Sequence, residues 1–568
     1  MCGINGFISN EKIHDFVNLY SSGMLLKSRG PERQSIYQTD NLFLMFHRLC
    51  ILNTSNAGDA PFVHIHGNTS YFILCNGEIY NYKDLELIYR LPSYPNDTSY
   101  IYPIFKRIRD NSYTLQPIEI FKQLNNALIG NEYALAMIEC VDNKPTNVYL
   151  SVDTSSVRPL FYYLDDTTGT YSFSSLLKGL TNINNINKKL IKRLPGGNMI
   201  HIDCKKQVSI TSSYLEPLKI NCIIPSSENI LNIDIVNKMY TAVKIRCQAD
   251  REIGCLLSGG LDSSLVAALA TIYLKKLGKK LKTFTIGMAG GSDLKYARQV
   301  AEYIDSDHTE ILFTKEEGLA VLEDVIKTTE TYDITTIRAS VGQYLIGKYI
   351  SENTNVKVIL NGDGADEIHL GYLYFHNLPS EEEGHLDSIR LIDDIHLYDG
   401  LRVDRCISHW GLESRLPFLD YNIVNFFKTL HPSIKKPRPN PGTSSPCMEK
   451  YFIRDSFDKY YSMLTPNMIL PFNILWRTKE AFSDGISDSE DSWYLIVQKY
   501  ITEYKKGVDI SKEYKHLPPV SYESRWYRET FENLFGEDVT SIIPYYWLPR
   551  FVKSTEPSAR TLDIYKQL

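Results

Sequence analysis

Paired cysteines are missing from this chain of 568 residues. Its ten cysteines include no Cys-x-x-Cys pair and none that precedes a histidine pair, so a structural zinc site is not expected. Several lie inside apolar runs, such as Cys75 in YFILC and Cys255 in IGCLL, where a buried and reduced thiol is the usual state.

Long apolar runs and an excess of positive charge are missing as well. The most apolar stretch, 265–274, is far shorter than the roughly 20 residues that span a bilayer. The start, MCGINGFISN, has neither the basic segment nor the apolar core of a secretion signal. We therefore expect a soluble, cytoplasmic protein without a membrane partner. With 61 Lys and Arg against 67 Asp and Glu, the net charge of −6 weighs against a nucleic-acid partner, because such binding depends on neutralising phosphates.

What the chain does have is the composition of a globular protein. Its 43% of hydrophobic residues and 12% of aromatic residues exclude a disordered chain, and its length predicts roughly two to four domains. Up to about residue 180, short apolar strands are separated by Gly, Asn, Asp and Pro turns, which predicts a sandwich or a layered antiparallel sheet. The clearest of these strands are 41–46, 71–75, 133–140, 148–152 and 171–175.

From about residue 228 the hydrophobic period changes. Helical patterns alternate with apolar strands, which predicts a doubly wound parallel sheet with its ligands beyond the carboxyl ends of the strands. These strands are 253–257, 283–288, 308–313 and 356–360. The segment 193–203 still fits a turn and a strand, so we place the domain boundary within 220–227. The five prolines of 431–446 predict a loop that holds neither a regular helix nor an inner strand.

A Gly-rich turn follows the first strand of this second part. Residues 257–264 read LSGGLDSS, in which two glycines let the backbone approach an anion while hydroxyl and N–H groups donate to phosphate oxygens. The spacing fits neither a P-loop nor a dinucleotide fingerprint. An Asp inside a phosphate cradle needs a cation beside it, so Asp262 is a natural Mg²⁺ ligand. A plain strand-to-helix turn is the alternative.

A second, acidic turn follows the apolar strand 356–360. It reads NGDGADE over residues 361–367. Two carboxylate-bearing turns at neighbouring strand ends could hold Mg²⁺ between them and a triphosphate. The alternative is an ordinary solvated turn.

Cys2 would carry a free α-amino group next to its thiol if Met1 were removed. That amine could serve as the base that generates the thiolate. Composition alone favours an incidental cysteine near the terminus, and the argument for a nucleophile depends on residues further along the chain.

These residues together could receive a zwitterionic amino acid with a cleavable amide, namely glutamine. Arg48 offers a planar fork for a carboxylate. Asn76 and the Gly77 N–H offer oxyanion donors, while Glu78 and Asp97 offer anions for an ammonium group.

The chain as a whole resembles the glutamine-hydrolysing asparagine synthetases. These consist of a class II glutamine amidotransferase domain fused to a synthetase domain of the ATP-pyrophosphatase type. The resemblance covers essentially the whole length. Its N-terminal motifs are MCGI, HRL, CNGEIYN and VDTSSVRPLFYY; its C-terminal motifs include LLSGGLDSSLVAALA, TYDITTIRAS, NGDGADE, LYDGLRVDR, MEKYFIRDSF, WRTKEAFSDGIS and EPSARTL.

The resemblance implies two domains. An Ntn-type antiparallel αββα sandwich, an α+β fold, is expected over 2–222. A doubly wound α/β sheet of the ATP-pyrophosphatase type is expected over 223–568. The implied reaction forms asparagine, AMP, diphosphate and glutamate from aspartate, ATP, glutamine and water, through β-aspartyl-AMP and channelled ammonia. Mg²⁺ is the implied metal, and a homodimer is a possible assembly.

The resemblance also implies the roles of single residues. Cys2 is the nucleophile, with Asn76 and Gly77 as the oxyanion site, and glutamine is bound by Arg48, Asn76, Gly77, Glu78 and Asp97. ATP is bound by Leu257, Ser258, Gly259, Gly260, Asp262, Ser263, Ile286, Asn361 and Gly362. Asp262 and Asp366 are the expected metal ligands. Asp363 is expected to act in the aspartyl-adenylate step, Lys450 to lie near the α-phosphate, and Asp399 to lie near the site of ammonia attack.

The chain departs from the family pattern at several positions. Asp363 stands where the family has Glu, which shortens the side chain by one methylene and could displace the carboxylate by about 1 Å. Asn361 replaces Ser, and His369 and Leu370 bring bulk to a tight bend. In the first domain the usual RDxxG reads Val-Asp-Thr-Ser-Ser at 152–156, and Ser175 replaces Glu.

Three other functions fit the same scaffold. One is ATP-dependent amide formation on another carboxylate, as in β-lactam synthetase-like or peptide-amidating enzymes, although such relatives often lack the N-terminal cysteine. Another is a catalytically weakened or regulatory relative, prompted by the altered turn 361–370. The third is a glutaminase uncoupled from synthesis.

Overall fold

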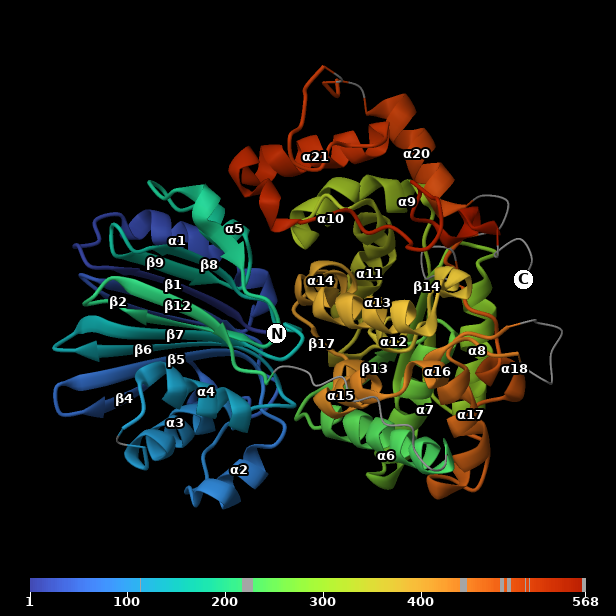
Figure 1. Cartoon of the computed structure of the whole chain (residues 1–568), viewed down its shortest axis with the longest axis horizontal. Coiled ribbons are helices and arrows are strands. Elements are labelled where there is room, and N and C mark those ends of the chain that lie inside the picture. The colour runs from blue at the N-terminus through green and yellow to red at the C-terminus, as the bar shows by residue number, and fades with distance from the viewer. Residues whose placement is uncertain are drawn as a thin grey trace. The chain divides into compact units, whose positions relative to one another are not determined.

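The computed structural model describes residues 1–112, 114–216, 228–439, 447–480, 485–487, 492–505, 507–509 and 511–563. They divide into two compact units (Figure 1). Unit 1 comprises Met1–Leu218, Ser408–Leu412 and Phe535–Ile542, and unit 2 comprises the remaining residues. The boundary predicted within 220–227 lies outside the described residues, so the domain limits 2–222 and 223–568 remain predictions.

Unit 1 is built on two six-stranded antiparallel sheets. Their strand orders are β10-β8-β9-β1-β3-β2 and β12-β11-β7-β6-β5-β4. The strands are β1 (Gly3–Ser9), β2 (Arg33–Thr39), β3 (Leu42–Arg48), β4 (Phe62–His66), β5 (Thr69–Glu78), β6 (Glu132–Val141), β7 (Lys144–Val152), β8 (Phe161–Asp165), β9 (Thr170–Ser174), β10 (Ile191–Arg193), β11 (Asn198–Asp203) and β12 (Val208–Ser213).

Helices cover the outer faces of both sheets. Figure 1 shows α1 and α5 against the first sheet and α3 and α4 against the second. The helices are α1 (Phe16–Met24), α2 (Tyr82–Tyr89), α3 (Ile101–Asp110), α4 (Pro117–Ala127) and α5 (Lys178–Thr181). The predicted αββα sandwich is confirmed.

Alternation along the strands explains the layers of unit 1. Phe72 and Leu74 of β5 belong to the cluster between the two sheets. Ile73 and Cys75, on the opposite face of the same strand, belong to the cluster under α3 and α4. Because successive side chains of a strand point to opposite faces, an almost continuous apolar run fills two cores at once.

Unit 2 contains a five-stranded parallel sheet in the order β15-β14-β13-β16-β17. Its strands are β13 (Glu252–Leu256), β14 (Lys282–Gly287), β15 (Asp307–Leu312), β16 (Val356–Leu360) and β17 (Glu413–Arg415). The predicted doubly wound sheet is confirmed. The chain runs outward from β13 to β15 and then returns to β16 on the other side of β13, which makes the β13–β16 junction the topological switch point where ligands usually bind.

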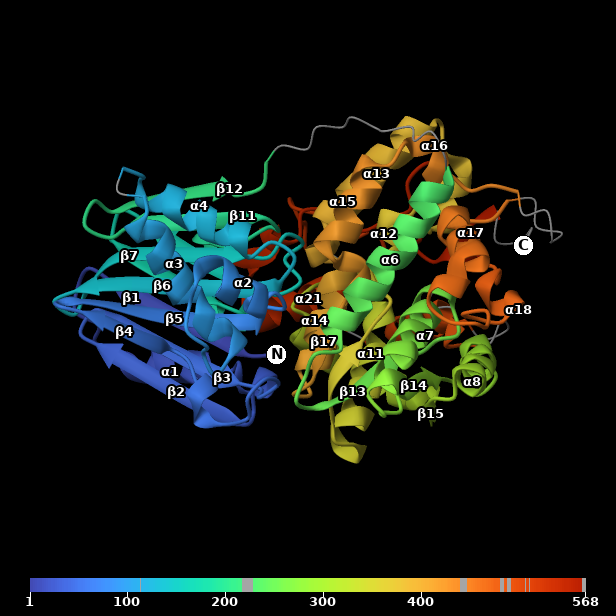
Figure 2. The same cartoon turned by 90° about the horizontal axis from the view of Figure 1, so that it is seen from below.

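Helices surround this sheet and position its loops. Helix α6 packs along α17 and α7 (Figure 2), while α11 contacts β14 and β16. The helices after residue 228 are α6 (Glu228–Arg246), α7 (Leu261–Lys276), α8 (Ser292–Ile304), α9 (Lys315–Ala320), α10 (Leu322–Thr329), α11 (Ile334–Asn353), α12 (Ala365–Ile368), α13 (Glu381–Asp393), α14 (Asp399–Ser408), α15 (Tyr421–Thr429), α16 (Pro432–Lys435), α17 (Tyr451–Tyr460), α18 (Phe472–Leu475), α20 (Trp493–Tyr504) and α21 (Tyr522–Phe535).

The loop predicted at 431–446 differs in one detail. Helix α16 is a single turn that starts at Pro432, so the prediction of no helix was wrong there. Proline is tolerated at the first helical position because its missing N–H would have no intrahelical partner. Residues 440–446 lie outside the described residues.

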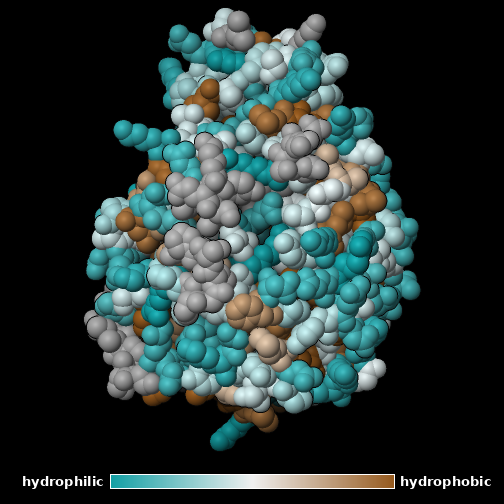
Figure 3. All heavy atoms as spheres, turned by 90° about the vertical axis from the view of Figure 1, so that its right-hand side faces the viewer, coloured by the Kyte–Doolittle hydropathy of each residue, from teal (hydrophilic) through white to brown (hydrophobic). Residues whose placement is uncertain are grey.

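Within the described ranges, no helix is both long and apolar enough to cross a bilayer. The face drawn in Figure 3 is mostly hydrophilic, with hydrophobic residues in small separate groups.

Candidate functional site

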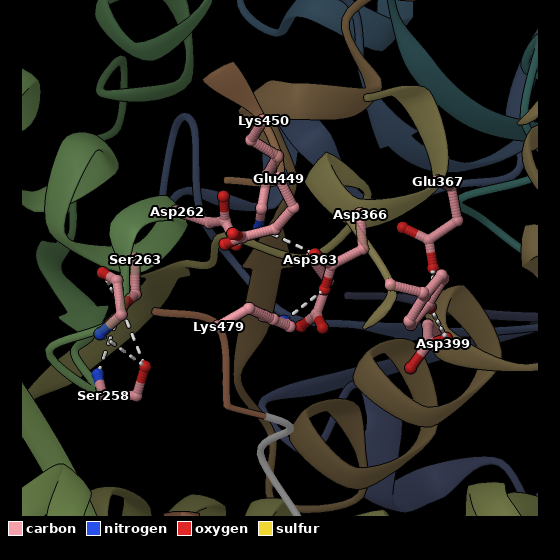
Figure 4. A network of polar contacts seen from close by, with 12 residues as sticks. Ser258, Asp262, Ser263, Asp363, Asp366, Glu367, Asp399, Glu449, Lys450 and Lys479 are labelled. Carbon is pink, nitrogen blue, oxygen red and sulfur yellow. Dashed lines mark hydrogen bonds and ion pairs between the residues drawn. The ribbon is translucent and has the colours of Figure 1, made fainter. Parts of the chain in front are cut away.

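The Gly-rich turn of unit 2 is a tight connection between β13 and α7. Gly259 adopts φ +73°, and a Cβ there would lie 2.4 Å from the carbonyl carbon of Tyr296. The backbone N–H of Ser258 donates to Oγ of Ser263 at 3.2 Å, and the Gly260 N–H donates to Oγ of Ser258 at 3.3 Å (Figure 4). These bonds fix the loop at the N-terminus of α7, where N–H groups are available to an anion.

The acidic turn after β16 packs directly on this loop. A Cβ on Gly362 would lie 2.7 Å from the backbone nitrogen of Ser263, so only glycine permits this approach. Asn361 accepts the Asp363 N–H at 3.2 Å, and Gly364 turns the chain with φ +97° into α12. The two turns therefore meet at the switch point, as their positions at neighbouring strand ends predict.

One cavity of about 220 Å³ lies at this junction. Its walls include almost every residue predicted for ATP, metal and adenylation: Leu257, Ser258, Gly260, Asp262, Ser263, Ile286, Asn361, Gly362, Asp363, Asp366, Asp399 and Lys450. Gly259 does not line the cavity; its left-handed backbone allows the loop to pack against Tyr296. Phe284, Thr335, Arg338, Gln343, Trp547 and Ser558 extend the wall beyond the predicted residues.

Two lysines neutralise the carboxylates of this cavity. The Lys450 Nζ lies 2.6 Å from Asp262 Oδ2 and 2.7 Å from Asp366 Oδ1, and the Lys479 Nζ lies 2.5 Å from Asp366 Oδ2 (Figure 4). Burial alone would raise the pKa of Asp366, but the two ammonium groups outweigh it and hold that pKa well below its usual range. Burial also opposes the charge of Lys479, and the carboxylates of Asp366 and Asp262 nevertheless raise its pKa.

The chemistry of the donor set fits Mg²⁺ together with a triphosphate. Asp262 Oδ1 is buried and has no hydrogen-bond partner among the described residues. The part of the chain that the structure describes contains no group of three or more His, Cys, Asp or Glu that could hold a metal ion by itself. Two carboxylates completed by phosphate oxygens and water are the usual form of a Mg²⁺ site, so Asp262 and Asp366 stay the proposed ligands.

A second acidic group also lines the cavity, next to Asp366. Arg402 Nη2 bonds Asp363 Oδ1 at 2.8 Å and Asp399 Oδ1 at 2.6 Å. The Tyr372 hydroxyl contacts Glu367 at 2.5 Å and Asp399 at 3.0 Å. Burial, with the neighbouring Asp399 and Asp366 charges, raises the pKa of both Asp363 and Glu367. With a raised pKa, these carboxyl groups are better proton acceptors than ordinary carboxylates.

The sequence reasoning missed Lys479, Arg402, Glu367 and Tyr372 as parts of this site. The first three lie inside motifs that carry the resemblance, WRTKEAFSDGIS, LYDGLRVDR and NGDGADE, and Tyr372 follows the last of them, but no spacing rule assigned these residues a role. Residues 481–484 and 488–491, around the end of the first motif, lie outside the described residues.

The altered bend after Glu367 is accommodated in the interior. His369 is buried between the rings of Phe427 and Phe452, at centroid distances of 4.8 and 6.0 Å. Leu370 adopts φ +51° and packs in an apolar cluster with Leu373. A non-glycine residue in this conformation is strained, and burial of the leucine side chain compensates.

Cys2 and Asn76 meet in unit 1. The Cys2 backbone N–H donates to Asn76 Oδ1 at 2.9 Å, and its Sγ lies 3.8 Å from the Leu49 carbonyl oxygen. Nδ2 of Asn76 is buried and has no hydrogen-bond partner in the described part of the chain, so it is a donor available to an oxyanion. Gly77 follows with φ +157°, and a Cβ there would lie 2.1 Å from the carbonyl oxygen of Glu132.

The other residues predicted for glutamine are buried around the same place. Arg48 donates to Asp59 Oδ1 at 2.8 Å and also to the carbonyl oxygens of Ser55 and Leu52. Asp97 Oδ2 accepts the Ile79 N–H at 2.7 Å, and Glu78 is 5% exposed. Their role in glutamine binding remains a prediction.

The two altered segments of unit 1 have structural partners there, through Ser175 in one and through the retained Asp153 in the other. Ser175 Oγ accepts the Ile4 N–H at 3.0 Å. Asp153 accepts backbone N–H groups of Ser155, Val157 and Arg158, each at 3.0 Å. Both side chains thus fix the backbone locally.

Comparisons with known proteins give the family. The family model described as "Asparagine synthase" matches residues 235–392 and 380–538, and the model described as "Glutamine amidotransferase domain" matches residues 1–100. The chain is 36% identical to an asparagine synthetase [glutamine-hydrolyzing] of Gallus gallus, covering 100% of this chain and 99% of that protein. It is also 36% identical to a probable asparagine synthetase [glutamine-hydrolyzing] of Acanthamoeba polyphaga mimivirus (99% and 100%) and 33% identical to the Homo sapiens protein of the same name (100% and 99%).

Solved structures share less with this chain. A glutamine phosphoribosylpyrophosphate amidotransferase of B. subtilis matches with 13% identity and a TM-score of 0.31, over 55% of this chain and 91% of that one. With the family models over both parts and curated relatives aligned from end to end, the chain belongs to the asparagine synthase family.

Proposed function

We propose that this protein makes L-asparagine from L-aspartate, with ATP as the energy source and the side-chain amide of L-glutamine as the nitrogen source. The products are L-asparagine, L-glutamate, AMP and diphosphate. The observation that carries the proposal is the cavity at the β13–β16 junction, where a phosphate-binding loop, an acidic turn, the buried Lys450 and the partly buried Lys479 face one another.

Glutamine hydrolysis is assigned to Cys2 of a chain that has lost Met1. The free α-amino group takes the thiol proton, and the thiolate attacks the side-chain carbonyl carbon of glutamine. Asn76 Nδ2 and the Gly77 N–H stabilise the oxyanion, and the C–N bond breaks with proton transfer to the departing ammonia. Water then cleaves the thioester and releases glutamate.

Adenylation is assigned to the cavity of unit 2. An oxygen of the aspartate side-chain carboxylate attacks the α-phosphorus of ATP, and diphosphate leaves. Lys450 and Lys479 stabilise the negative charge that grows on the phosphate oxygens, because a preorganised cation in a buried site acts strongly on such charge. Mg²⁺, held by Asp262 and Asp366, would neutralise phosphate charge and favour departure of diphosphate.

Amide formation completes the reaction. Ammonia attacks the acyl carbon of β-aspartyl-AMP, the new C–N bond forms, and AMP leaves with the electrons of the C–O bond. The surplus proton of the nitrogen passes to the carboxyl groups of Asp363 and Glu367, whose raised pKa suits this role. The proposal includes a cytoplasmic location and leaves a homodimer as a possible assembly.

The substitution Cys2→Ala tests the proposal. It should lower glutamine-dependent asparagine formation by about 10³-fold or more, while ammonia-dependent formation stays within about twofold of the wild type. Cys447→Ala, the same change at a partly buried cysteine outside both sites, is the matched control. Mass spectrometry of the intact chain should show Cys2 as the first residue.

The outcomes separate the other functions. If the wild type forms no asparagine from either nitrogen source, the proposal fails. Diphosphate release from ATP that requires a carboxylate other than aspartate would then indicate an amide synthetase for that substrate. No release at all would indicate a silent relative, and glutamate formation without AMP would indicate an uncoupled glutaminase.

A further inference from the structure

The polar side chain of Gln343 lies in the wall of the cavity and has no role in the reaction steps proposed above. It lies on α11 and is 3% exposed. Its Nε2 donates to Asp363 Oδ2 over 3.4 Å, a long contact. Its Oε1 is buried and has no hydrogen-bond partner among the described residues.

A buried amide oxygen without a hydrogen-bond donor indicates that a ligand supplies one. Burial without a hydrogen bond forfeits the interaction that water would have given, and nearly all buried polar groups in native structures have a partner. Because Gln343 lines the cavity, a molecule inside the cavity can supply the missing donor. The ligand must therefore carry an N–H or O–H group beside Asp363.

The groups beside Gln343 decide which donor fits. Asp363 is bound on its other oxygen by Arg402 at 2.8 Å, and the same guanidinium nitrogen bonds Asp399 at 2.6 Å. Gln343 Oε1 and Asp363 Oδ2 therefore offer a ligand two acceptors on neighbouring side chains. Ammonia is neutral, and its three N–H groups can be shared between acceptors while its lone pair remains available for attack.

We propose that Gln343 binds the ammonia nucleophile. Its Oε1 accepts one N–H of ammonia, and its Nε2 holds Asp363 Oδ2 in position to accept a second N–H of the same molecule. This inference rests on the proposed function and deepens it by naming the residue that sets the position of the nitrogen. Asp363 stands where the family has the longer Glu, and Gln343 of α11 donates a hydrogen bond to its carboxylate.

Gln343→Met is the test, since methionine has similar volume and offers no comparable acceptor. With saturating ATP and aspartate, the KM for ammonia should rise roughly tenfold, the effect of one lost hydrogen bond. Aspartate-dependent exchange of diphosphate into ATP, which reports adenylation alone, and the KM for aspartate should stay within about twofold. The Tm should stay within about 2 °C of the wild type, because the substitution removes an oxygen without a partner and, besides it, only the long contact to Asp363.

Gln299→Met is the matched control, on a half-buried glutamine of α8 that bonds Asn473 outside the cavity. An unchanged KM for ammonia in Gln343→Met would overturn the inference. So would an equal rise in the KM for aspartate, which would assign the amide to that substrate, or a lowered Tm, which would make its role structural. Failure of the wild type to form asparagine from ammonia and aspartate would overturn the proposed function, and this inference with it.

Discussion

His369 is an imidazole that the fold keeps neutral. It is 1% exposed, and neither ring nitrogen has a hydrogen-bond partner among the described residues. Burial, together with the nearby positive charges of Lys435 and Lys450, lowers the pKa of His369 to about 3. The native state therefore binds the proton only in strong acid, whereas the unfolded chain binds it near pH 6.5.

This difference predicts acid lability. Because the folded pKa lies below the unfolded one, the unfolded state gains the proton first, and stability is lost as the pH falls from about 6.5 toward 3. Because of His369, the free energy of unfolding should decrease by about 2 kcal/mol when the pH falls from 7 to 5. His369→Phe keeps an aromatic ring against Phe427 and Phe452 and should reduce the pH-dependent loss by that amount in urea unfolding. His14→Phe, at an exposed position, should leave it unchanged, and equal losses in the wild type and His369→Phe would contradict this account.

Single residues differ in how well their sequence context predicts them. Cys2 and Asn76 are 74 positions apart, yet both could be proposed because each follows a recognisable pattern and the chemistry requires both. Lys479 and Gln343 could not be proposed, because a lysine or glutamine without a motif of its own gives no signal. Their roles become visible only when the fold places them beside Asp366 and Asp363.

At the scale of elements, the loop between β13 and α7 depends on one of its two glycines. Gly259 has φ +73° and no room for a Cβ, whereas Gly260 has φ −74° and its nearest neighbour would be Ser258 Oγ at 3.3 Å. Alanine at a left-handed position costs about 1–2 kcal/mol before any overlap is counted.

The two glycines form a matched pair for mutation. Gly259→Ala should lower the Tm by about 3–8 °C and reduce aspartate-dependent diphosphate exchange by about 10²-fold, because the backbone of the phosphate loop must move. Gly260→Ala should keep the Tm within about 2 °C of the wild type. Calorimetry and the exchange assay check both, and equal damage from the two substitutions would show that φ is not the deciding factor.

Elements with a clear hydrophobic pattern were predictable, and polar ones were not. The strand predicted at 283–288 is β14 (Lys282–Gly287), and the alternation of strands and helices was enough to place both ligand turns at one edge of the sheet. Strand β17 reads Glu-Ser-Arg and gave no signal. It is buried because Arg415 bonds Glu413 at 2.9 Å and the carbonyl oxygens of Arg246 and Gln248, a set of contacts that depends on tertiary structure.

At the scale of the whole molecule, each unit carries one half of the proposed chemistry. Cys2 and Asn76 belong to unit 1, and the carboxylates and lysines of the cavity belong to unit 2. A substitution at the site of one unit should therefore remove one half-reaction and leave the other measurable.

Lys479→Met makes this argument testable. Loss of the ammonium group leaves Asp366 with Lys450 alone and removes one cation from the site of phosphate charge. Aspartate-dependent diphosphate exchange should fall by about 10²–10³-fold. Glutamate release from glutamine should persist, because Cys2 and its oxyanion donors are unchanged. Lys276→Met, at an exposed lysine of α7 that bonds the Tyr240 hydroxyl, is the matched control and should retain both activities. Parallel loss of glutamate release and exchange in Lys479→Met would show that the two half-reactions cannot be separated by residue, and would contradict the assignment of one to each unit.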